Sequence, residues 1–274
     1  MDIVKDFSQQ TLTQAIAANM LERSMAQGRC KDVKLYEENG LIWTVSGLPI
    51  AFSNQICDTQ ISEENADSVI EKMIRFFREK NLPFGWLLGP TTTPQNLGEH
   101  LLKHGIGYEG ETPGMSFDLS KLDSECAMPD GLELVRVTNR DELDLFTEAS
   151  MRGFATPFDI REYIIKTSLD LIFDPETGWS NYVGLINGEA VATTSMFLGG
   201  GVAGIYGVAT IPEMRQRGIG KAMTMAPLYE AVELGYQVGI LRAAPDAATF
   251  YRKFGWEDQC SFSNYAWRPD DLES

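Results

Sequence analysis

The residues best suited to chemistry lie in one basic, glycine-rich segment, residues 208–222, which reads VATIPEMRQRGIGKA. A strand is expected to lead into this segment and a helix to leave it, so that the glycines form the turn between them. Backbone N–H groups of such a turn can converge on one point, and the helix N-terminus adds a partial positive charge. Arg215, Arg217 and Lys221 add full charges, and no Asp or Glu lies between residues 214 and 229. The segment therefore predicts a site for a pyrophosphate group, against the alternative of an ordinary basic loop.

Two other glycine motifs suggest nucleotide sites that their context argues against. Residues 199–204 satisfy G-x-G-x-x-G, but a strand is expected after them, where dinucleotide binding requires a helix. Lys221 follows a glycine as in a phosphate-binding NTPase loop, but Ala222 stands where that loop needs Ser or Thr, and Arg215 where it needs Gly. Residues 199–204 therefore predict a hairpin turn, and a magnesium–nucleotide site is not expected.

The elements that position the basic segment follow from the pattern of the second half of the chain. Alternation of apolar residues predicts strands, helical periodicity predicts helices, and Asn187-Gly188 is a strong two-residue hairpin signal. The expected strands are 131–137, 179–186, 190–198, 202–211, 236–243 and 256–267, and the expected helices are 139–154, 158–173, 220–234 and 246–254.

The first half of the chain shows a similar but less regular order of elements. Helices are expected over residues 9–27, 66–80 and 94–103, and strands within 34–53, at 86–88 and over 105–119. A polar stretch that ends in Pro129-Asp130 separates the halves. We therefore expect an α/β (α+β) fold of two similar halves in tandem, with domains at 1–125 and 126–274.

The second half of the chain resembles the GCN5-related N-acetyltransferase (GNAT) family. Residues 215–220, RQRGIG, resemble its R/Q-x-x-G-x-G/A signature, and residues 208–212 are similar to its pantetheine-binding strand. Residues 244–256 resemble its second cofactor motif, with Tyr251 followed by Gly255-Trp256. The resemblance covers residues 131–267 and implies a mixed sheet splayed open between its fourth and fifth strands, with helices on its faces. Acetyl-CoA, as acyl donor, would lie in that opening.

The resemblance also implies roles for individual residues. Tyr251 would protonate the leaving thiolate as the catalytic acid, or would pack as a half-buried core tyrosine. A backbone N–H near Val208 or Ala209 would meet the developing oxyanion. Gly207, inside an expected strand, marks either a bulge that frees backbone groups for a ligand or a packing glycine. The residues expected to bind the acyl donor are Val208, Ala209, Thr210, Arg215, Gln216, Arg217, Gly218, Ile219, Gly220, Lys221 and Ala222.

No residue of the sequence stands out as the general base. Glu148 and Asp159 are weak candidates, and a water relay is an equal alternative. Cys260 lacks a histidine in its half to activate it, so we expect a structural thiol and direct transfer in a ternary complex. Ala244 replaces the Asn or Ser that many GNAT proteins use to bond the cofactor. The function expected is N-acetyl transfer from acetyl-CoA to a primary amine; the alternative is a non-catalytic acyl-CoA-binding regulatory protein.

The composition bounds the class of protein and its partners. The formal net charge of -16 argues against nucleic acid or an anionic membrane surface as a partner. The charge would suit a cationic amine, although an acidic surface that only confers solubility explains it as well. The acceptor is thus expected to be a small-molecule or peptide amine, and the sequence does not indicate an oligomeric state.

The sequence has no apolar run of the roughly 18 residues that a membrane span needs and no secretory signal at its start, and its four cysteines are widely spaced. These features predict a cytoplasmic location.

Two further groups of residues have weaker claims to function. His100 and His104 are four apart on an expected helix, but two ligands without a third predict no metal site. Phe154, Phe158 and Tyr163 flank a region that often lines the acceptor pocket in the GNAT family, and core packing explains them equally well. The first half has no R/Q-x-x-G-x-G/A signature, so we expect it to shape the substrate site or form an interface.

Overall fold

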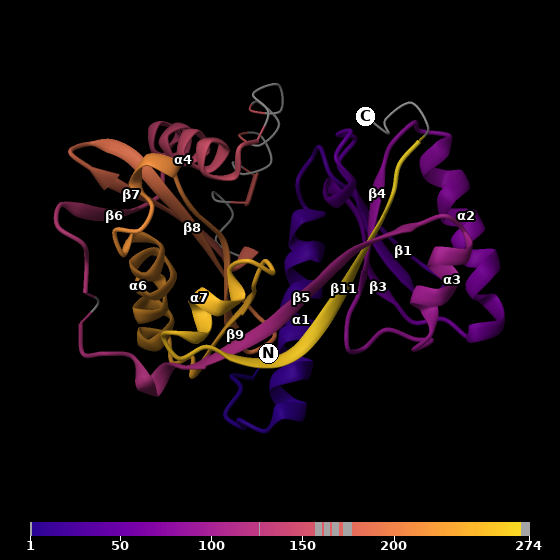
Figure 1. Ribbon diagram of the computed structural model, residues 1–274, viewed down its shortest axis with the longest axis horizontal. Coiled ribbons are helices and arrows are strands. Elements are labelled where there is room, and N and C mark those ends of the chain that lie inside the picture. Colours follow the sequence, from indigo (N-terminus) through magenta and orange to yellow (C-terminus); the bar gives the residue numbers. More distant parts are fainter. Residues whose placement is uncertain are drawn as a thin grey trace.

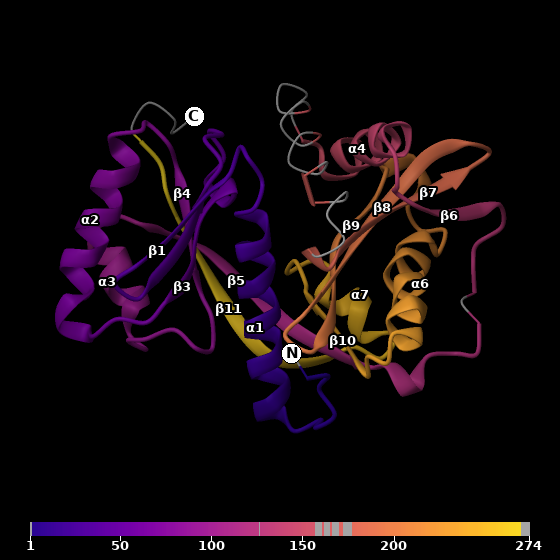
Figure 2. The same ribbon diagram turned by 180° about the vertical axis from the view of Figure 1, so that it is seen from behind.

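Two long antiparallel strands, β5 (Gly107–Asp118) and β11 (Glu257–Trp267), run side by side through the middle of the molecule and connect its two halves (Figure 1). The computed structural model describes residues 2–125, 127–156, 161, 165, 170–171 and 177–269. The N-terminal half lies at one end of these strands and the C-terminal half at the other, with helix α1 (Gln9–Gln27) standing between them (Figure 2).

The described strands form one mixed sheet of eleven strands in the order β1-β2-β3-β4-β11-β5-β10-β9-β8-β7-β6. Two strand pairs are parallel, β3 with β4 and β9 with β10, and the others are antiparallel. The remaining strands are β1 (Lys34–Glu38), β2 (Leu41–Val45), β3 (Asn54–Thr59), β4 (Phe84–Leu88), β6 (Leu132–Arg136), β7 (Trp179–Ile186), β8 (Glu189–Gly199), β9 (Val202–Thr210) and β10 (Val238–Arg242).

The halves exchange their last strands. β11, which ends the C-terminal half, lies between β4 and β5 of the N-terminal half. In return, β5 pairs with β10 of the C-terminal half, with Val238 opposite Asp118 and Arg242 opposite Gly114. Each half of the sheet is therefore completed by a strand from the other, and separating the halves would break backbone hydrogen bonds along both β5 and β11.

Helices cover both faces of the sheet. Helix α4 (Arg140–Phe154) and α6 (Ile219–Glu233) lie on opposite faces of the C-terminal half, because Val183 packs with α4 whereas Gly184, the next residue of β7, faces Met223 of α6. α1 shares the α4 face and contacts strands of both halves. The other helices among the described residues are α2 (Ala66–Arg78), α3 (Leu97–Lys103), α7 (Ala248–Arg252), and the short 3-10 turns η1 (Ala51–Ser53), η2 (Glu63–Asn65), η3 (Leu119–Lys121) and η6 (Pro212–Met214).

An aromatic core holds the N-terminal half together. Phe77 of α2 stacks on Phe84 of β4 with ring centroids 4.5 Å apart, and both rings are fully buried beside Trp86. Along α2 the buried residues Ile70, Met73, Ile74 and Phe77 recur every three or four positions, which is the spacing of one helix face. Each such side chain contributes about 1.5–3 kcal/mol when it leaves water.

Most expected elements are confirmed, including the mixed sheet, and their ends shift by a few residues. The Asn187-Gly188 turn is confirmed, with φ of +52° and +79° at its two residues. Strand β3 was not predicted, α3 begins three residues later than expected, and the expected helix 158–173 falls largely outside the described residues. Cys57 and Cys260 are free thiols. Within the described ranges no helix is both long and apolar enough for a membrane span.

Candidate active site

The sheet opens between β9 and β10. Their parallel pairing extends only from Ala203 opposite Gly239 to Ile205 opposite Leu241, whereas β9 continues to Thr210. The edge of β9 beyond Ile205 is therefore not paired with β10. This is the splay between the fourth and fifth strands of the C-terminal half that the family resemblance implies.

A bulge lies where the opening begins. Ser195 of β8 faces Tyr206, but Thr193 faces Ala209, so β9 holds one residue more than its partner between these pairs. Gly207 sits in this interval with φ of +58°, and its carbonyl accepts a 3.0 Å hydrogen bond from the Thr193 hydroxyl. The left-handed backbone at Gly207 is open to glycine at little cost, and the expected bulge is confirmed.

Strand alternation then fixes which backbone groups face the opening. The Ile211 N–H donates to the Val191 carbonyl of β8 at 2.9 Å. Successive residues of a strand direct their N–H and C=O groups to opposite edges, so Ala209 also faces β8, while Val208 and Thr210 face away from it. Of the two amides expected to meet the oxyanion, that of Val208 is the one directed into the opening.

The turn of residues 215–218 is exposed and shaped to present its amides. Gln216 and Gly218 have φ of +64° and +79°, and no side chain caps the N-terminus of α6. Within the described chain, the N–H groups of residues 216–218 have no hydrogen-bond acceptor. Residues 219–221 form the first turn of α6, whose N–H groups lack partners inside a helix. Free amides and the helix dipole thus converge on one exposed turn, which is the arrangement that binds phosphate groups.

The charged side chains of the turn divide between two tasks. Arg215 donates from Nε to the Thr210 carbonyl at 3.1 Å and from Nη2 to the Gly153 carbonyl at 3.0 Å, so it fastens the turn to β9 and α4. Arg217 is exposed and has no hydrogen-bond or ion-pair partner in the described part of the chain. Lys221 lies over the Phe254 ring, with Nζ 5.9 Å from its centroid.

A pocket of about 310 Å³ adjoins the start of α6, and three lysines line it: Lys121, Lys221 and Lys253. The side chains of Ile219 and Ala222, also expected to bind the acyl donor, are buried in the core. They can offer a ligand only their backbone, whereas the lysines can offer charge.

Tyr251 lies on α7, and only 8% of its surface is exposed. Its ring packs against Phe250, Phe254 and Trp256, with centroids 5.2, 5.8 and 6.2 Å away. Burial raises the pKa of its phenol, and the facing Thr224 hydroxyl opposes that rise. The group therefore holds its proton at neutral pH, as an acid must before it donates.

Among the described residues, the others considered from the sequence do not add a base or a nucleophile. Glu148 lies 3.7 Å from Arg152 in an exposed ion pair. Asp159 lies outside the described residues, as do Phe158 and Tyr163, while Phe154 is 53% exposed. Burial raises the pKa of Cys260 to about 11, so the thiol stays protonated and weakly nucleophilic.

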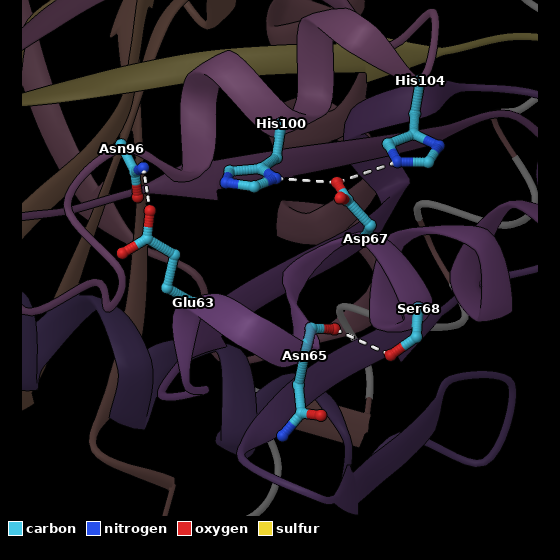
Figure 3. A network of polar contacts seen from close by, with 7 residues as sticks. All are labelled: Glu63, Asn65, Asp67, Ser68, Asn96, His100 and His104. Atoms are coloured by element: carbon cyan, nitrogen blue, oxygen red, sulfur yellow. Dashed lines mark hydrogen bonds and ion pairs between the residues drawn. The ribbon is translucent and has the colours of Figure 1, made fainter.

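His100 and His104 of the N-terminal half converge on a carboxylate (Figure 3). The Asp67 Oδ1 atom lies 2.7 Å from His100 Nδ1 and 3.0 Å from His104 Nε2. Among the residues that the structure describes, no group of three or more His, Cys, Asp or Glu is arranged to hold a metal ion. The cluster joins α2 to α3, with the Asn96–Glu63 hydrogen bond beside it.

A second pocket, which the sequence did not predict, lies between the halves. Its volume is about 270 Å³, and its lining includes Arg23 of α1, Gln55 of β3, Trp179 and Asn181 of β7, and Ser195 of β8. These residues come from four elements spread over most of the chain, so no local motif marks them. The sequence signal for this pocket was limited to Arg23, a charged residue on the expected helix 9–27. In the structure this helix contacts both halves.

Comparison with known proteins agrees with this architecture. Residues 135–258 match the model of the acetyltransferase (GNAT) domain. The fold is similar to a GCN5-related N-acetyltransferase from Kribbella flavida, with a TM-score of 0.70 and 17% identity over 93% of this chain and 97% of that one. It is also similar to a tandem GNAT protein from the clavulanic acid biosynthesis pathway, with a TM-score of 0.64 and 12% identity over 97% of each chain. The GCN5-related N-acetyltransferase from Sphaerobacter thermophilus gives a TM-score of 0.61 and 16% identity over 86% of this chain and 83% of that one. No curated protein matches the sequence.

These findings define a tandem GNAT fold. Residues 135–258 match the GNAT acetyltransferase domain, and the chain is GNAT-like in fold throughout, its N-terminal half included. The domain supports acyl transfer as the general class of chemistry.

Proposed function

We propose that this protein is an N-acetyltransferase that moves an acetyl group from acetyl-CoA to a primary amine by direct attack in a ternary complex. The observation that carries the proposal is the exposed turn 216–221, whose amides have no acceptor among the described residues and open the N-terminus of α6. Acetyl-CoA is the acyl donor that GNAT proteins generally use, and its diphosphate suits such a turn.

The path of the donor follows the backbone of β9. Val208 directs its N–H and C=O groups into the opening, so it can bond the amides of pantetheine or the thioester carbonyl. Arg217 and Lys221 supply free positive charge near the phosphates. Arg215 acts as a positioning residue, because its hydrogen bonds to Thr210 and Gly153 hold the turn in place.

The proposed reaction needs an attack by the amine on the thioester and a proton donor for the leaving thiolate. The neutral amine nitrogen bonds to the thioester carbon, and the Val208 N–H stabilises the negative charge that develops on the carbonyl oxygen. The carbon–sulfur bond breaks with its electron pair going to sulfur, which takes the proton of the Tyr251 hydroxyl. The new amide nitrogen loses a proton to solvent, and Tyr251 regains one from solvent.

The alternative is an acyl-CoA-binding protein without catalysis, which the replacement of a bonding residue by Ala244 would suit. The two functions separate in one assay: binding of coenzyme A by calorimetry, followed by thiol release from acetyl-CoA across a panel of amines. Binding with amine-dependent thiol release supports the transferase. Binding without release for any amine supports the alternative, and absence of binding removes both.

A further inference from the structure

Among the described residues, the lining of the pocket between the halves carries a positive charge in an acidic protein. Its charged lining residue is Arg23, and no Asp or Glu is found among the described residues that line it, although the chain carries a net charge of -16. Asp170 lies beside the pocket near Cys30, where its carboxylate already accepts a 2.9 Å hydrogen bond from the Lys31 amide. The local charge is thus opposite to that of the whole protein.

Among the described residues, Arg23 has no anionic partner. Its Nε atom is buried without a hydrogen bond, and the described residues offer its guanidinium neither an acceptor nor an ion pair. The guanidinium instead lies over the Tyr206 ring, with Cζ 4.8 Å from the centroid. Burying a charged donor without an acceptor is costly, so a structure that does so presents a site for an anion.

A second, half-buried arginine adds to the positive field. Arg242, at the end of β10, lies close enough to Arg23 for the two charges to interact. Burial, and then the charge of Arg23, lower the pKa of Arg242 to about 10. Its one hydrogen bond to a side chain goes to the Asn264 amide oxygen at 3.4 Å, and no carboxylate in the described chain pairs with it. Both charges act on Tyr206, whose hydroxyl is bonded to Asn19 and does not neutralise them.

The pocket reaches the strand on which we place the reaction. Ser195 lines it and is the register partner of Tyr206, directly before the Gly207 bulge. A Cβ atom placed on Gly207 would lie 3.7 Å from the Ser195 hydroxyl, so the two residues are in contact distance. A ligand that fills the pocket would therefore lie next to the opening between β9 and β10.

We propose that this pocket binds the acceptor, and that the acceptor is an amine that also carries a carboxylate, held by the guanidinium of Arg23. The planar fork of arginine matches a carboxylate, and the pocket size suits a small molecule. Trp179 and the polar groups of Asn181 and Gln55 complete the walls around the rest of the ligand. This inference rests on the proposed function, and it assigns the N-terminal half a share of the acceptor site.

The two arginines also act on the acceptor nitrogen. Positive charges nearby disfavour an ammonium ion and lower the pKa of a bound amine. An amine held near Arg23 and Arg242 would therefore lose its proton more readily, which favours the neutral form that attack requires. The carboxylate supplies the attraction that brings such an amine to a positive pocket.

The test compares matched ligands and matched variants. Thiol release is measured with glycine against methylamine, β-alanine against ethylamine, and lysine against 1,5-diaminopentane. Binding of the same carboxylates is followed by intrinsic tryptophan fluorescence, to which Trp179 of the pocket contributes. We expect the carboxylate member of at least one pair to bind and to react with the higher kcat/KM. Arg23→Gln should weaken binding of that carboxylate-bearing amine and raise the KM for it about tenfold or more. The KM for acetyl-CoA should stay unchanged.

Three controls keep the outcome clear. Arg75→Gln removes the same charge from the exposed face of α2. It should change neither the binding of the carboxylate-bearing amine nor the KM for it. Ser53→Glu places a competing carboxylate at the pocket and should also weaken binding of the acid, even if Arg23→Gln fails to fold. The inference is overturned if none of the carboxylates binds, or if binding is the same in wild type, Arg23→Gln and Ser53→Glu. Loss of coenzyme A binding in the wild-type protein would instead remove the proposed function.

Discussion

The hydroxyl of Tyr206 on β9 donates a 2.6 Å hydrogen bond to the side-chain oxygen of Asn19 on α1. The Asn19 amide nitrogen in turn donates to the carbonyls of Phe197, Gly199 and Val202, at 3.2, 2.8 and 3.3 Å. One fully buried side chain thus fixes α1 to the turn between β8 and β9. Since α1 also carries Arg23, this contact sets where the pocket between the halves lies relative to the acetyltransferase strand.

Replacing Asn19 with Ala should destabilise the fold by about 3 kcal/mol, because the Tyr206 hydroxyl and buried carbonyls lose their partner. Urea denaturation measures the change in the free energy of unfolding. Tyr206→Phe removes only one of these bonds and should cost less. A double-mutant cycle should show coupling between the two residues, and strictly additive losses would contradict the contact.

Gly218→Ala should weaken coenzyme A binding at least tenfold. Its φ of +79° strains any residue with a Cβ by about 1–2 kcal/mol, so the alanine would pull the turn away from the shape that presents its amides. Gly188→Ala is the matched control, because Gly188 has the same φ of +79° in a hairpin where no atom lies within 4 Å of an added Cβ. Both variants should lose similar stability, and calorimetry should show reduced affinity only for Gly218→Ala.

Tyr251→Phe should lower kcat by about a hundredfold while leaving the KM for acetyl-CoA near its wild-type value. Burial raises the pKa of the phenol above its ordinary value of 10.0, so the wild-type acid stays protonated through neutral and mildly alkaline pH. The alkaline midpoint that this group sets in the wild-type profile of kcat should therefore lie above pH 10. Unchanged kcat in Tyr251→Phe would limit Tyr251 to a packing role.

Asp67 should make stability depend on pH under acidic conditions. Hydrogen bonds from His100 first, and then His104, lower the pKa of its carboxyl below the ordinary 3.8. A lowered folded-state pKa stabilises the fold above pH 3.8, and this contribution is lost as pH falls through the folded-state value. The urea midpoint of Asp67→Asn should lie below that of wild type at neutral pH and converge with it on acidification. Glu64→Gln, an exposed neighbour, should follow the wild-type curve.

The sequence predicted what local patterns determine. The helical periodicity of apolar residues predicted α1, α4 and α6, and the Asn187-Gly188 turn predicted the β7–β8 hairpin. The motif at residues 215–220 predicted the turn at the start of α6. Gly207, a glycine inside a strand, indicated either a bulge or a packing glycine, and the structure shows the bulge. Each of these features depends on residues close together in the chain.

What the sequence could not predict depends on distant residues meeting. The insertion of β11 between β4 and β5 is set by pairing across more than a hundred residues, such as Tyr265 with Trp86, for which no local signal exists. The hydrogen bonds that occupy Arg215 involve the carbonyl of Gly153 from another helix. The positive charge of the pocket was likewise not predicted. The net charge of the whole chain is -16, and it does not show that Arg23 and Arg242 lie close together.

The exchanged strands have a consequence for synthesis of the chain. When the first 125 residues have left the ribosome, β4 and β5 are made, but the strand that lies between them ends at residue 267. Until then both strands present unpaired backbone edges, which are templates for aggregation. Maturation of the N-terminal half must therefore wait until residue 267 has been translated, and a product truncated before β11 would expose those edges to chaperones and proteases.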